Sequence, residues 1–270
     1  MTKQKILVVR KMSALEYYYQ GQHENPAIRE SAKNHDRSVA KIERILKKEK
    51  QNFDVITRRD LSENLVMSYD AVISAGGDGT VIATAFYNIK TPQLNIKTDT
   101  RSVGALCQED IKESIENFLS GDYAMENWTR QDVYLNGKFV GRALNEVCLG
   151  EGLKFSKLAK YDLRFSDFEI GLRRNESQSG SGLIIVTGTG STAWPAAFKP
   201  FSRNSRYFEF RNLLPHSGMI DYAKTDEILI DYRGHEGKFA IDTVEFDLPR
   251  DSQLQIEVSK YPLPVILSGK

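Results

Sequence analysis

The chain lacks the features that define several common classes of protein. Its 270 residues include only two cysteines, Cys107 and Cys148, and neither belongs to a Cys-x-x-Cys pair. This excludes a disulfide scaffold and a cysteine-based metal site, and it favours a reducing compartment. No apolar run approaches the ~20 residues that span a bilayer, and no signal or transit segment precedes the apolar run from Ile6. We therefore expect a cytoplasmic protein, or a mitochondrial-matrix protein if a transit segment has been removed.

An excess of charge of either sign is also absent. The 37 Lys and Arg residues nearly balance the 36 Asp and Glu residues, and hydrophobic residues make up 40% of the chain. Such a chain generates no field that would attract nucleic acid or an anionic membrane. We expect neither of those partners, and we expect small-molecule substrates instead. The length allows one large domain or two modest ones, with enough material for a buried core.

The first part of the chain alternates strand-like and helix-like segments. This pattern predicts a doubly wound α/β domain over residues 1–122. The helix-like segment at 31–50 has apolar residues at helical spacing, and Gly121 is a plausible stop for the helix at 109–119. Residues 11–30 show no clear period, so we expect a loop over the site. Strand-like runs occupy residues 5–9, 53–57, 69–74 and 92–96.

The second part, residues 123–258, is predicted to be β-rich and antiparallel. Asn136-Gly137 separates two strand-like runs at 130–135 and 138–144, which is typical of a hairpin with a type I′ turn. A second hairpin is expected at 161–172 around residues 166 and 167, and residues 199–218 look irregular. Further strands are expected at 183–186, 227–231, 238–241, 244–247 and 254–258.

Residues 76–80 read Gly-Gly-Asp-Gly-Thr and link an apolar strand to a helix-like stretch. Gly76, Gly77 and Gly79 let the backbone approach a bulky anion, and the following helix N-terminus attracts phosphate. Asp78 repels a phosphate unless it takes a proton or binds a metal, so it is the best candidate general base. The alternative is a simple tight turn, which requires neither three glycines nor Thr80 at the helix start.

A second motif follows the apolar strand at 183–186. Its glycine, threonine and serine residues offer many hydrogen-bonding groups at close range, which suits the base edges and ribose hydroxyls of a nucleotide. Trp194 would then stack on a purine. The alternative is a Ser/Thr turn that caps a helix, with Trp194 in the core. The motif comprises Thr187, Gly188, Thr189, Gly190, Ser191, Thr192, Ala193 and Trp194.

A polar pair, Asn145-Glu146, stands within an otherwise apolar run. Burying such a pair is expensive unless its groups are satisfied. Asn145 offers a donor and an acceptor, and Glu146 offers acceptors, so the pair could clamp ribose hydroxyls. The alternative is alternation on an exposed strand, but two adjacent polar residues break that alternation.

These three motifs occur in the order and spacing of the NAD kinase family, which the chain resembles over residues 34–194. Residues 98–107 and 144–151 are similar to the mitochondrial-type branch, whose members also have Thr-Gly-Thr-Gly-Ser-x-Ala-Trp. The resemblance implies phosphorylation of the 2′-hydroxyl of the adenosine ribose of NAD or NADH by ATP with Mg²⁺. It also implies a homodimer or homotetramer, and a C-terminal tail, residues 259–270, that returns to the α/β domain.

The resemblance also implies residue roles. Asp78 would be the base, and Gly76, Gly77, Gly79 and Thr80 would cradle the donor phosphates. Asn145 and Glu146 would hold the adenosine portion of NAD. The nucleotide site would be lined by Thr187, Thr189, Gly190, Ser191, Thr192, Ala193 and Trp194. No residue is expected to be a dedicated metal ligand.

Two positions depart from the family pattern. Lys97 replaces the usual asparagine, and Ser181 replaces an aspartate that often reaches a neighbouring subunit. These departures leave open a non-catalytic dinucleotide-binding regulator. A lipid kinase of the diacylglycerol or sphingosine class also shares Gly-Gly-Asp-Gly, but the other two motifs argue against it.

Overall fold

The computed structural model describes residues 3–13, 15–16, 25–152, 157–194, 196–218 and 222–269. The chain forms two compact units. Unit 1 comprises the chain up to Asn127 together with the chain from Leu263 onward, and unit 2 comprises Trp128–Pro262. Each unit has its own sheets and core. Within the described ranges, no helix combines the length and apolar character that crossing a membrane requires.

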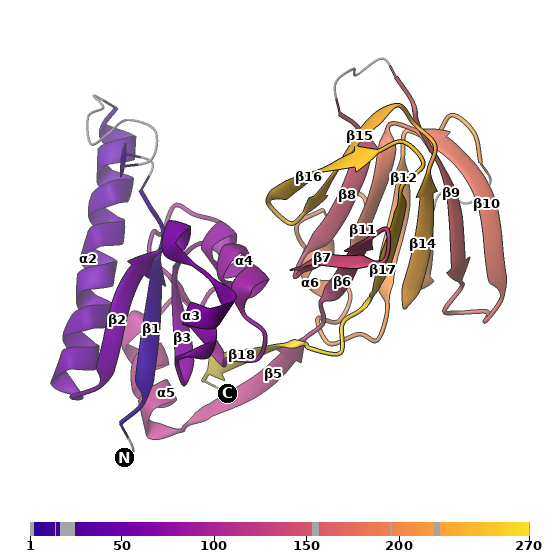
Figure 1. The fold of residues 1–270 in the computed structure, drawn as a ribbon. Helices are drawn as coiled ribbons and strands as arrows, with labels where there is room; N and C mark the ends of the chain where they lie inside the picture. The colour runs from indigo at the N-terminus through magenta and orange to yellow at the C-terminus, as the bar shows by residue number, and fades with distance from the viewer. Residues whose placement is uncertain are drawn as a thin grey trace. The chain divides into compact units, whose positions relative to one another are not determined.

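Unit 1 contains a sheet in the order β2-β1-β3-β4-β18-β5. The neighbours from β2 through β18 run parallel, as expected for buried apolar strands connected through helices. Figure 1 shows the yellow C-terminal strand β18 entering the sheet of the N-terminal part. The strands are β1 (Lys5–Arg10), β2 (Asn52–Thr57), β3 (Ala71–Gly76), β4 (Gln93–Lys97), β5 (Tyr123–Trp128) and β18 (Leu263–Ser268).

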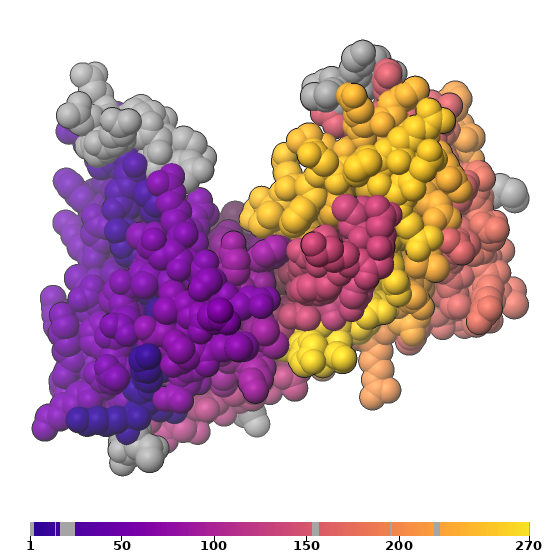
Figure 2. All heavy atoms as spheres, in the orientation of Figure 1, coloured from indigo at the N-terminus to yellow at the C-terminus, as the bar shows by residue number. Residues whose placement is uncertain are grey.

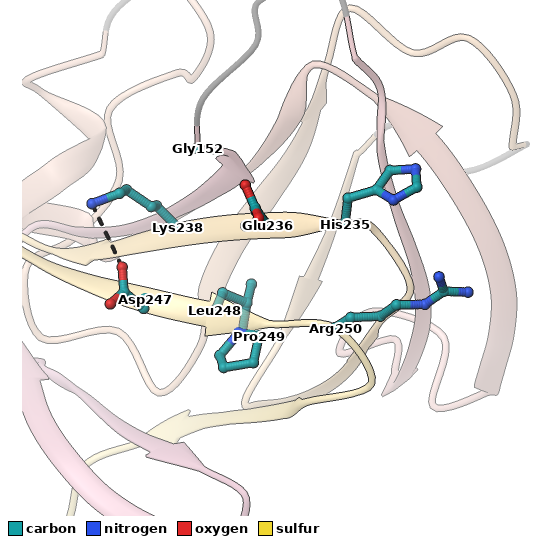
Figure 3. A pocket seen from close by; sticks show the side chains of 9 residues that line it. Gly152, His235, Glu236, Lys238, Asp247, Leu248, Pro249 and Arg250 are labelled. Carbon is teal, nitrogen blue, oxygen red and sulfur yellow. Dashed lines mark ion pairs between the residues drawn. The ribbon is translucent and has the colours of Figure 1, made fainter.

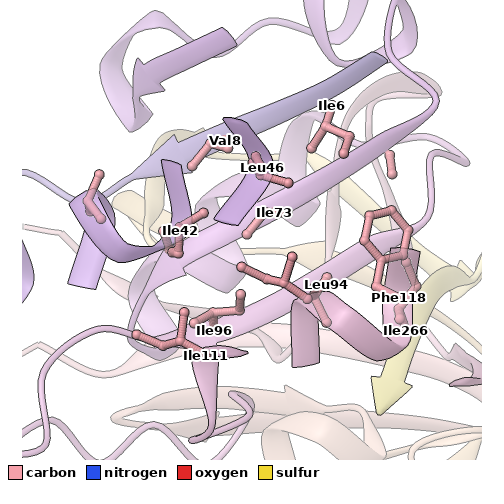
Figure 4. Close-up of a cluster of buried hydrophobic side chains, with 14 residues drawn as sticks. Ile6, Val8, Ile42, Leu46, Ile73, Leu94, Ile96, Ile111, Phe118 and Ile266 are labelled. Carbon is pink, nitrogen blue, oxygen red and sulfur yellow. The ribbon is translucent and has the colours of Figure 1, made fainter. Parts of the chain in front are cut away.

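Helices cover both faces of this sheet. On one face, Ile42 and Leu46 of α2 and Phe118 of α5 pack with strand residues such as Ile73 (Figure 4). On the other face, Val66 of α3 packs with Leu7. The doubly wound α/β prediction is confirmed. The helical elements are α2 (Pro26–Lys48), the 3₁₀ turn η1 (Arg58–Asp60), α3 (Glu63–Met67), α4 (Asp78–Tyr87) and α5 (Ile111–Ser120).

Helix α2 begins earlier than the sequence pattern indicated. Asn25 caps it by accepting a hydrogen bond from the Ala27 amide at 2.9 Å, and Pro26 occupies the first turn. Both are standard helix-start signals, so the expectation of a loop over residues 11–30 is wrong for residues 26–30. Residues 14 and 17–24 of that loop lie outside the described residues. Helix α5 ends at Gly121 in a left-handed conformation (φ 83°), as expected.

Unit 2 consists of two antiparallel sheets. The first has the order β10-β9-β14-β17-β6-β7 and the second β13-β12-β11-β8-β15-β16. The strands are β6 (Gln131–Leu135), β7 (Lys138–Ala143), β8 (Glu146–Glu151), β9 (Ala159–Ser166), β10 (Arg173–Gly180), β11 (Gly182–Val186), β12 (Phe208–Leu213), β13 (Tyr222–Thr225), β14 (Glu227–Tyr232), β15 (Glu236–Ile241), β16 (Val244–Pro249) and β17 (Gln253–Val258), with the short helix α6 (Gly188–Ser191). In Figure 2, yellow atoms from the later part of this unit lie beside rose atoms from its beginning, and β17 pairs with β6.

The structure confirms the first hairpin and corrects the second. Asn136 (φ 51°) and Gly137 (φ 77°) both adopt the left-handed conformation that a type I′ turn requires. In the second hairpin, the second strand is β10 and starts at Arg173, not at Phe168. The alternating apolar residues Phe168, Ile170 and Leu172 are exposed in the connection, so alternation alone misled the assignment.

Two further assignments differ from the sequence-based expectation. The segment 199–218, expected to be irregular, contains β12, whose Phe208 and Phe210 are buried. Residues 123–127, expected to lie in the β-rich part, belong to strand β5, which lies in the sheet of unit 1. In both cases the long-range strand partner decides the assignment, because the local sequence carries only weak periodicity.

Candidate functional site

The glycine-rich turn lies where β3 enters α4, at the carboxyl edge of the parallel sheet. Its glycines are not equivalent. A Cβ on Gly76 would lie 2.1 Å from Thr80 Oγ1, whereas a Cβ on Gly79 would meet no protein atom within 4 Å. Gly76 is therefore required by the packing of the protein itself. Gly79 faces open space, so its lack of a side chain serves access to the turn.

Asp78 is the first residue of α4, and its carboxylate is held by a neighbouring loop. The amide of Leu106 donates to Oδ1 at 2.9 Å and the amide of Ala105 donates to Oδ2 at 3.1 Å. Gly104 (φ 61°) provides the turn that brings these amides round. These two backbone amides fix the orientation of the carboxylate, which a positioned base requires.

Lys97 packs on the same loop. A Cβ on Gly104 would lie 2.9 Å from the Lys97 side chain, and the Lys97 ammonium pairs with Glu109 at 3.1 Å. Lys97 therefore ties the loop to the residues just before α5.

Polar groups also gather at the ends of β1 and β4. His35 of α2 is fully buried and contacts the Lys11 carbonyl at 3.0 Å and the Thr98 hydroxyl at 2.8 Å. Burial, with the charge of Lys11, lowers the pKa of His35 to about 4, so its ring is neutral at pH 7. Because a carbonyl only accepts, Nε2 donates to Lys11 and Nδ1 accepts from Thr98. Asp99 accepts from Ser31 and lies 3.6 Å from the Lys11 ammonium.

In unit 2, Asn145 and Glu146 lie at the junction between two sheets. Residues 144 and 145 form a bend after β7 of the first sheet, and Glu146 opens β8 of the second. The expectation that the pair lies within one apolar strand is therefore wrong. The pair interrupts the alternation because the chain crosses from one sheet to the other at this point.

The Thr187–Trp194 motif contacts this junction directly. The Thr187 amide donates to the Asn145 carbonyl at 2.9 Å, and the Thr187 hydroxyl donates to the Leu144 carbonyl at 2.5 Å. A Cβ on Gly190 would lie 2.1 Å from the Asn145 oxygen, so the two segments touch and position 190 accepts only glycine. The motif forms the short helix α6, with Ser191 buried and Thr192 and Ala193 exposed.

Three buried acceptors in these two segments have no hydrogen-bond partner in the described part of the chain. They are Asn145 Oδ1, Glu146 Oε2 and Thr189 Oγ1. Asn145 is 5% exposed and Thr189 is 1% exposed. A buried polar atom without a partner costs about 1–3 kcal/mol, so such a group points to a ligand that completes it. Acceptors of this kind suit the hydroxyl groups of a sugar.

Glu146 has an unusual electrostatic environment. Burial, and then the charge of Asp242, raises the pKa of Glu146 to about 7, while a hydrogen bond from the Trp194 side chain lowers it. Trp194 is 42% exposed and is therefore not a core residue. The other tryptophan, Trp128, is 1% exposed and stacks against Arg203. Part of Trp194 is thus exposed, whereas Trp128 is buried.

A separate cavity of about 550 Å³ lies along β15 and β16, with Gly152, His235 and Arg250 at its rim. Figure 3 shows Lys238 and Asp247 facing one another across the two strands, and their charged groups lie 3.6 Å apart. No predicted site residue lines this cavity. Among the described residues, no three His, Cys, Asp or Glu side chains gather as a metal-binding group.

Comparison with known proteins extends these observations, although no family model matches the chain. It is 36% identical over 142 residues to an NAD kinase from Clostridium kluyveri, covering 50% of this chain and 47% of that protein. It is 28% identical over 230 residues to a mitochondrial NAD kinase 2 from Xenopus tropicalis, covering 63% of this chain and 53% of that protein. The chain thus spans about half the length of the curated relatives it matches.

Two solved structures share the fold over nearly the whole chain. An NAD kinase from Archaeoglobus fulgidus in complex with ATP has a TM-score of 0.72 at 20% identity, covering 97% of this chain and 92% of that chain. A yeast NADH kinase complexed with NADH has a TM-score of 0.75 at 15% identity, covering 100% and 85%. The chain thus has a two-domain architecture, a parallel α/β unit and an antiparallel β unit. The sequence relatives named above are NAD kinases, one bacterial and one mitochondrial. The two proteins that share its fold are an NAD kinase and an NADH kinase.

Sequence reasoning singled out two groups of candidate residues but did not point to Asp242. This residue lies in the turn between β15 and β16 and contacts the Asn145-Glu146 junction. Its only sequence signal is an Asp-Thr pair between two strand-like runs, which is typical of any hairpin turn.

Proposed function

We propose that the protein is an NAD kinase that transfers the terminal phosphate of ATP to the 2′-hydroxyl of the adenosine ribose of NAD or NADH. The observation that carries the proposal is the set of buried acceptors without partners at Asn145, Glu146 and Thr189. The sugar hydroxyls of a dinucleotide supply the donors that these acceptors lack. The names of the relatives and of the two solved kinases support the same assignment.

The residues of unit 2 bind and orient the dinucleotide. Asn145 and Glu146 accept hydrogen bonds from its ribose, and Trp194 stacks on a base. Thr189 adds a hydroxyl from the adjacent turn. The rest of the nucleotide site is formed by Thr187, Gly190, Ser191, Thr192 and Ala193.

The glycine-rich turn of unit 1 holds the phosphate donor. Gly77, Gly79 and Thr80 offer the backbone of the helix start to the ATP phosphates, and Gly76 lets Thr80 pack at the turn. The Asp78 carboxylate takes the proton of the 2′-hydroxyl while the 2′-oxygen of the ribose forms a bond to the γ-phosphorus of ATP. The bond from that phosphorus to the β,γ-bridging oxygen breaks, and ADP leaves.

Mg²⁺ enters this scheme with ATP. The described residues provide Asp78 beside the turn but no cluster of three metal ligands, which fits an ion carried largely by substrate phosphates. When bound, the ion neutralises phosphate charge. We further propose a cytoplasmic homodimer or homotetramer. Light scattering that returns a concentration-independent 30.6 kDa species would contradict the oligomer.

One assay tests the function. Purified protein is incubated with ATP, Mg²⁺ and NAD, and NADP is measured; diacylglycerol and sphingosine replace NAD in parallel reactions. We expect NADP and no phosphorylated lipid. Dinucleotide binding without NADP would instead identify a regulator, and phosphorylated lipid would identify a lipid kinase.

A further inference from the structure

Asp242 is a partly exposed residue whose carboxylate is aimed at the backbone of the Asn145-Glu146 junction. Its Oδ2 accepts from the Leu144 amide at 2.8 Å, and its Oδ1 accepts from the amides of Asn145 at 2.8 Å and Glu146 at 3.1 Å. The amide of Asp242 itself donates to the Glu146 carbonyl at 2.9 Å. Four hydrogen bonds therefore join this one residue to three consecutive residues that lie nearly a hundred positions earlier in the chain.

The opposite side of the junction is held by the second motif. The Leu144 and Asn145 carbonyls accept from Thr187, and Gly190 packs on the Asn145 oxygen. The backbone of the junction is thus fixed from two directions, by Asp242 on its N–H side and by Thr187 on its C=O side. With the backbone groups occupied, the side chains of Asn145 and Glu146 remain to receive a ligand.

We propose that Asp242 is the positioning residue for dinucleotide binding: it sets the conformation of the junction that aims Asn145 and Glu146 at the ligand. This inference rests on the proposed NAD kinase function. Asp242 touches the junction backbone rather than the substrate, so it acts through Asn145 and Glu146.

The chemistry of the position favours a carboxylate. Three converging amides need two acceptor oxygens and no donor, which only an ionised Asp or Glu side chain provides. Asparagine would direct an NH₂ group at one of these amides. Asp242 also adopts a left-handed backbone (φ 52°), which lets β15 turn tightly into β16 while its short side chain reaches the junction.

The test substitutes Asp242→Asn and measures KM for NAD and for ATP separately. Misplacing a binding group by about 1 Å costs up to roughly 100-fold, so we expect KM for NAD to rise between tenfold and 100-fold while KM for ATP stays within threefold. NAD affinity by calorimetry should fall in parallel. Equal changes in both KM values, or a lower Tm with unchanged KM values, would overturn the proposal.

Two controls separate positioning from stability. Asp251→Asn makes the same substitution at another left-handed turn residue of unit 2 (φ 61°), and it should leave both KM values unchanged. Asp132→Asn removes the buried partner of Arg142, 2.5 Å away, and it should lower Tm without selective loss of NAD affinity. A selective loss in either control would also count against Asp242.

A second substitution covers a folding failure. If Asp242→Asn does not fold, Asp242→Glu keeps the charge and both acceptor oxygens but moves them by one methylene. We expect it to raise KM for NAD selectively, and an unchanged KM would refute the proposal. Failure of the proposed function is distinguishable, because the wild type would then bind NAD in calorimetry without forming NADP, or would not bind it.

Discussion

The two candidate sites offer opposite kinds of hydrogen-bonding group. The glycine-rich turn of unit 1 presents the start of α4, with Gly79 facing open space and the Asp78 carboxylate already held by two amides. The junction in unit 2 presents buried acceptors without partners at Asn145, Glu146 and Thr189. A helix N-terminus attracts anions, whereas buried acceptor atoms without hydrogen-bond partners attract the hydroxyl donors of a ligand.

The contrast explains why the residue types differ between the sites. Phosphate carries its own negative charge, so its site needs close access to the backbone and few acidic groups. Ribose is neutral and donates through its hydroxyls, so its site tolerates two carboxyl groups, Glu146 and Asp242. Burial raises the pKa of Glu146 to about 7 and that of Asp242 to about 6.

The largest effect is expected from a substitution in the unit 1 site. Asp78→Asn keeps the size of the side chain but removes its ability to take a proton. Loss of a positioned base costs ~10²–10⁴-fold in rate, so we expect turnover to collapse while NAD binding stays near normal. Steady-state kinetics and calorimetry measure the two quantities. A variant that keeps a third of wild-type turnover would remove Asp78 from this role.

On the unit 2 side, Glu146→Gln replaces one acceptor oxygen with a donor. A buried hydrogen-bonding group that is left mispaired costs about 1–3 kcal/mol, so KM for NAD should rise roughly fivefold to 100-fold while KM for ATP changes little. Separate KM measurements for the two substrates give the answer. If both stay unchanged and only thermal stability falls, Glu146 has a structural role.

The same variant has a second readout in the pH dependence of stability. The pKa of Glu146 rises from 4.5 to about 7 on folding, so the native state holds a proton that the unfolded state has lost. The unfolding free energy of the wild type therefore falls as pH rises from about 4.5 to 7, by on the order of 3 kcal/mol from this group. We expect urea unfolding to show that the unfolding free energy of Glu146→Gln, relative to that of the wild type, is higher at pH 8 than at pH 5. If the difference in unfolding free energy between variant and wild type were the same at both pH values, the raised pKa of Glu146 would be contradicted.

Fluorescence of Trp194 tests whether this residue stacks on a base of NAD. Stacking on a base contributes ~1–3 kcal/mol, so Trp194→Ala should weaken NAD binding about tenfold or more. It should also remove most of the NAD-dependent change in emission, because buried Trp128 keeps a constant signal. Trp194→Phe should retain much of the affinity through its remaining ring face. Normal NAD binding by Trp194→Ala with a lower Tm would show that stacking is wrong.

Gly79→Ala has the smallest expected effect. It tests whether glycine is needed at this position for access of the ATP phosphates or for packing of the protein. The protein leaves room for the added Cβ, and alanine favours a helix by about 0.8–1.0 kcal/mol over glycine, so Tm should not fall. A phosphate that approaches this backbone loses about one hydrogen bond, so KM for ATP should rise about fivefold. Gly76→Ala is the control, because its Cβ would clash with Thr80 and lower Tm. An unchanged KM for ATP in Gly79→Ala would place the phosphates elsewhere.

Prediction from the sequence succeeded where the signal is local. The Asn136-Gly137 hairpin, the α5 stop at Gly121 and the strand-to-helix turn at Asp78 follow from backbone preferences that a few residues determine. It failed where a distant partner decides. Phe168, Ile170 and Leu172 alternate like a strand but lie in the turn between β9 and β10, whereas β12 is stabilised by pairing with β11.

The sequence by itself therefore determined the two motif groups, the class of each unit and the residues whose chemistry suits phosphate or ribose. Only the tertiary structure decided that the Asn145-Glu146 pair lies at a crossing between sheets, and that Asp242 and Thr187 hold it from opposite sides. Contacts between residues so far apart in the chain leave no local pattern. They arise because buried backbone amides and carbonyls must find partners wherever the packing of the sheets brings them.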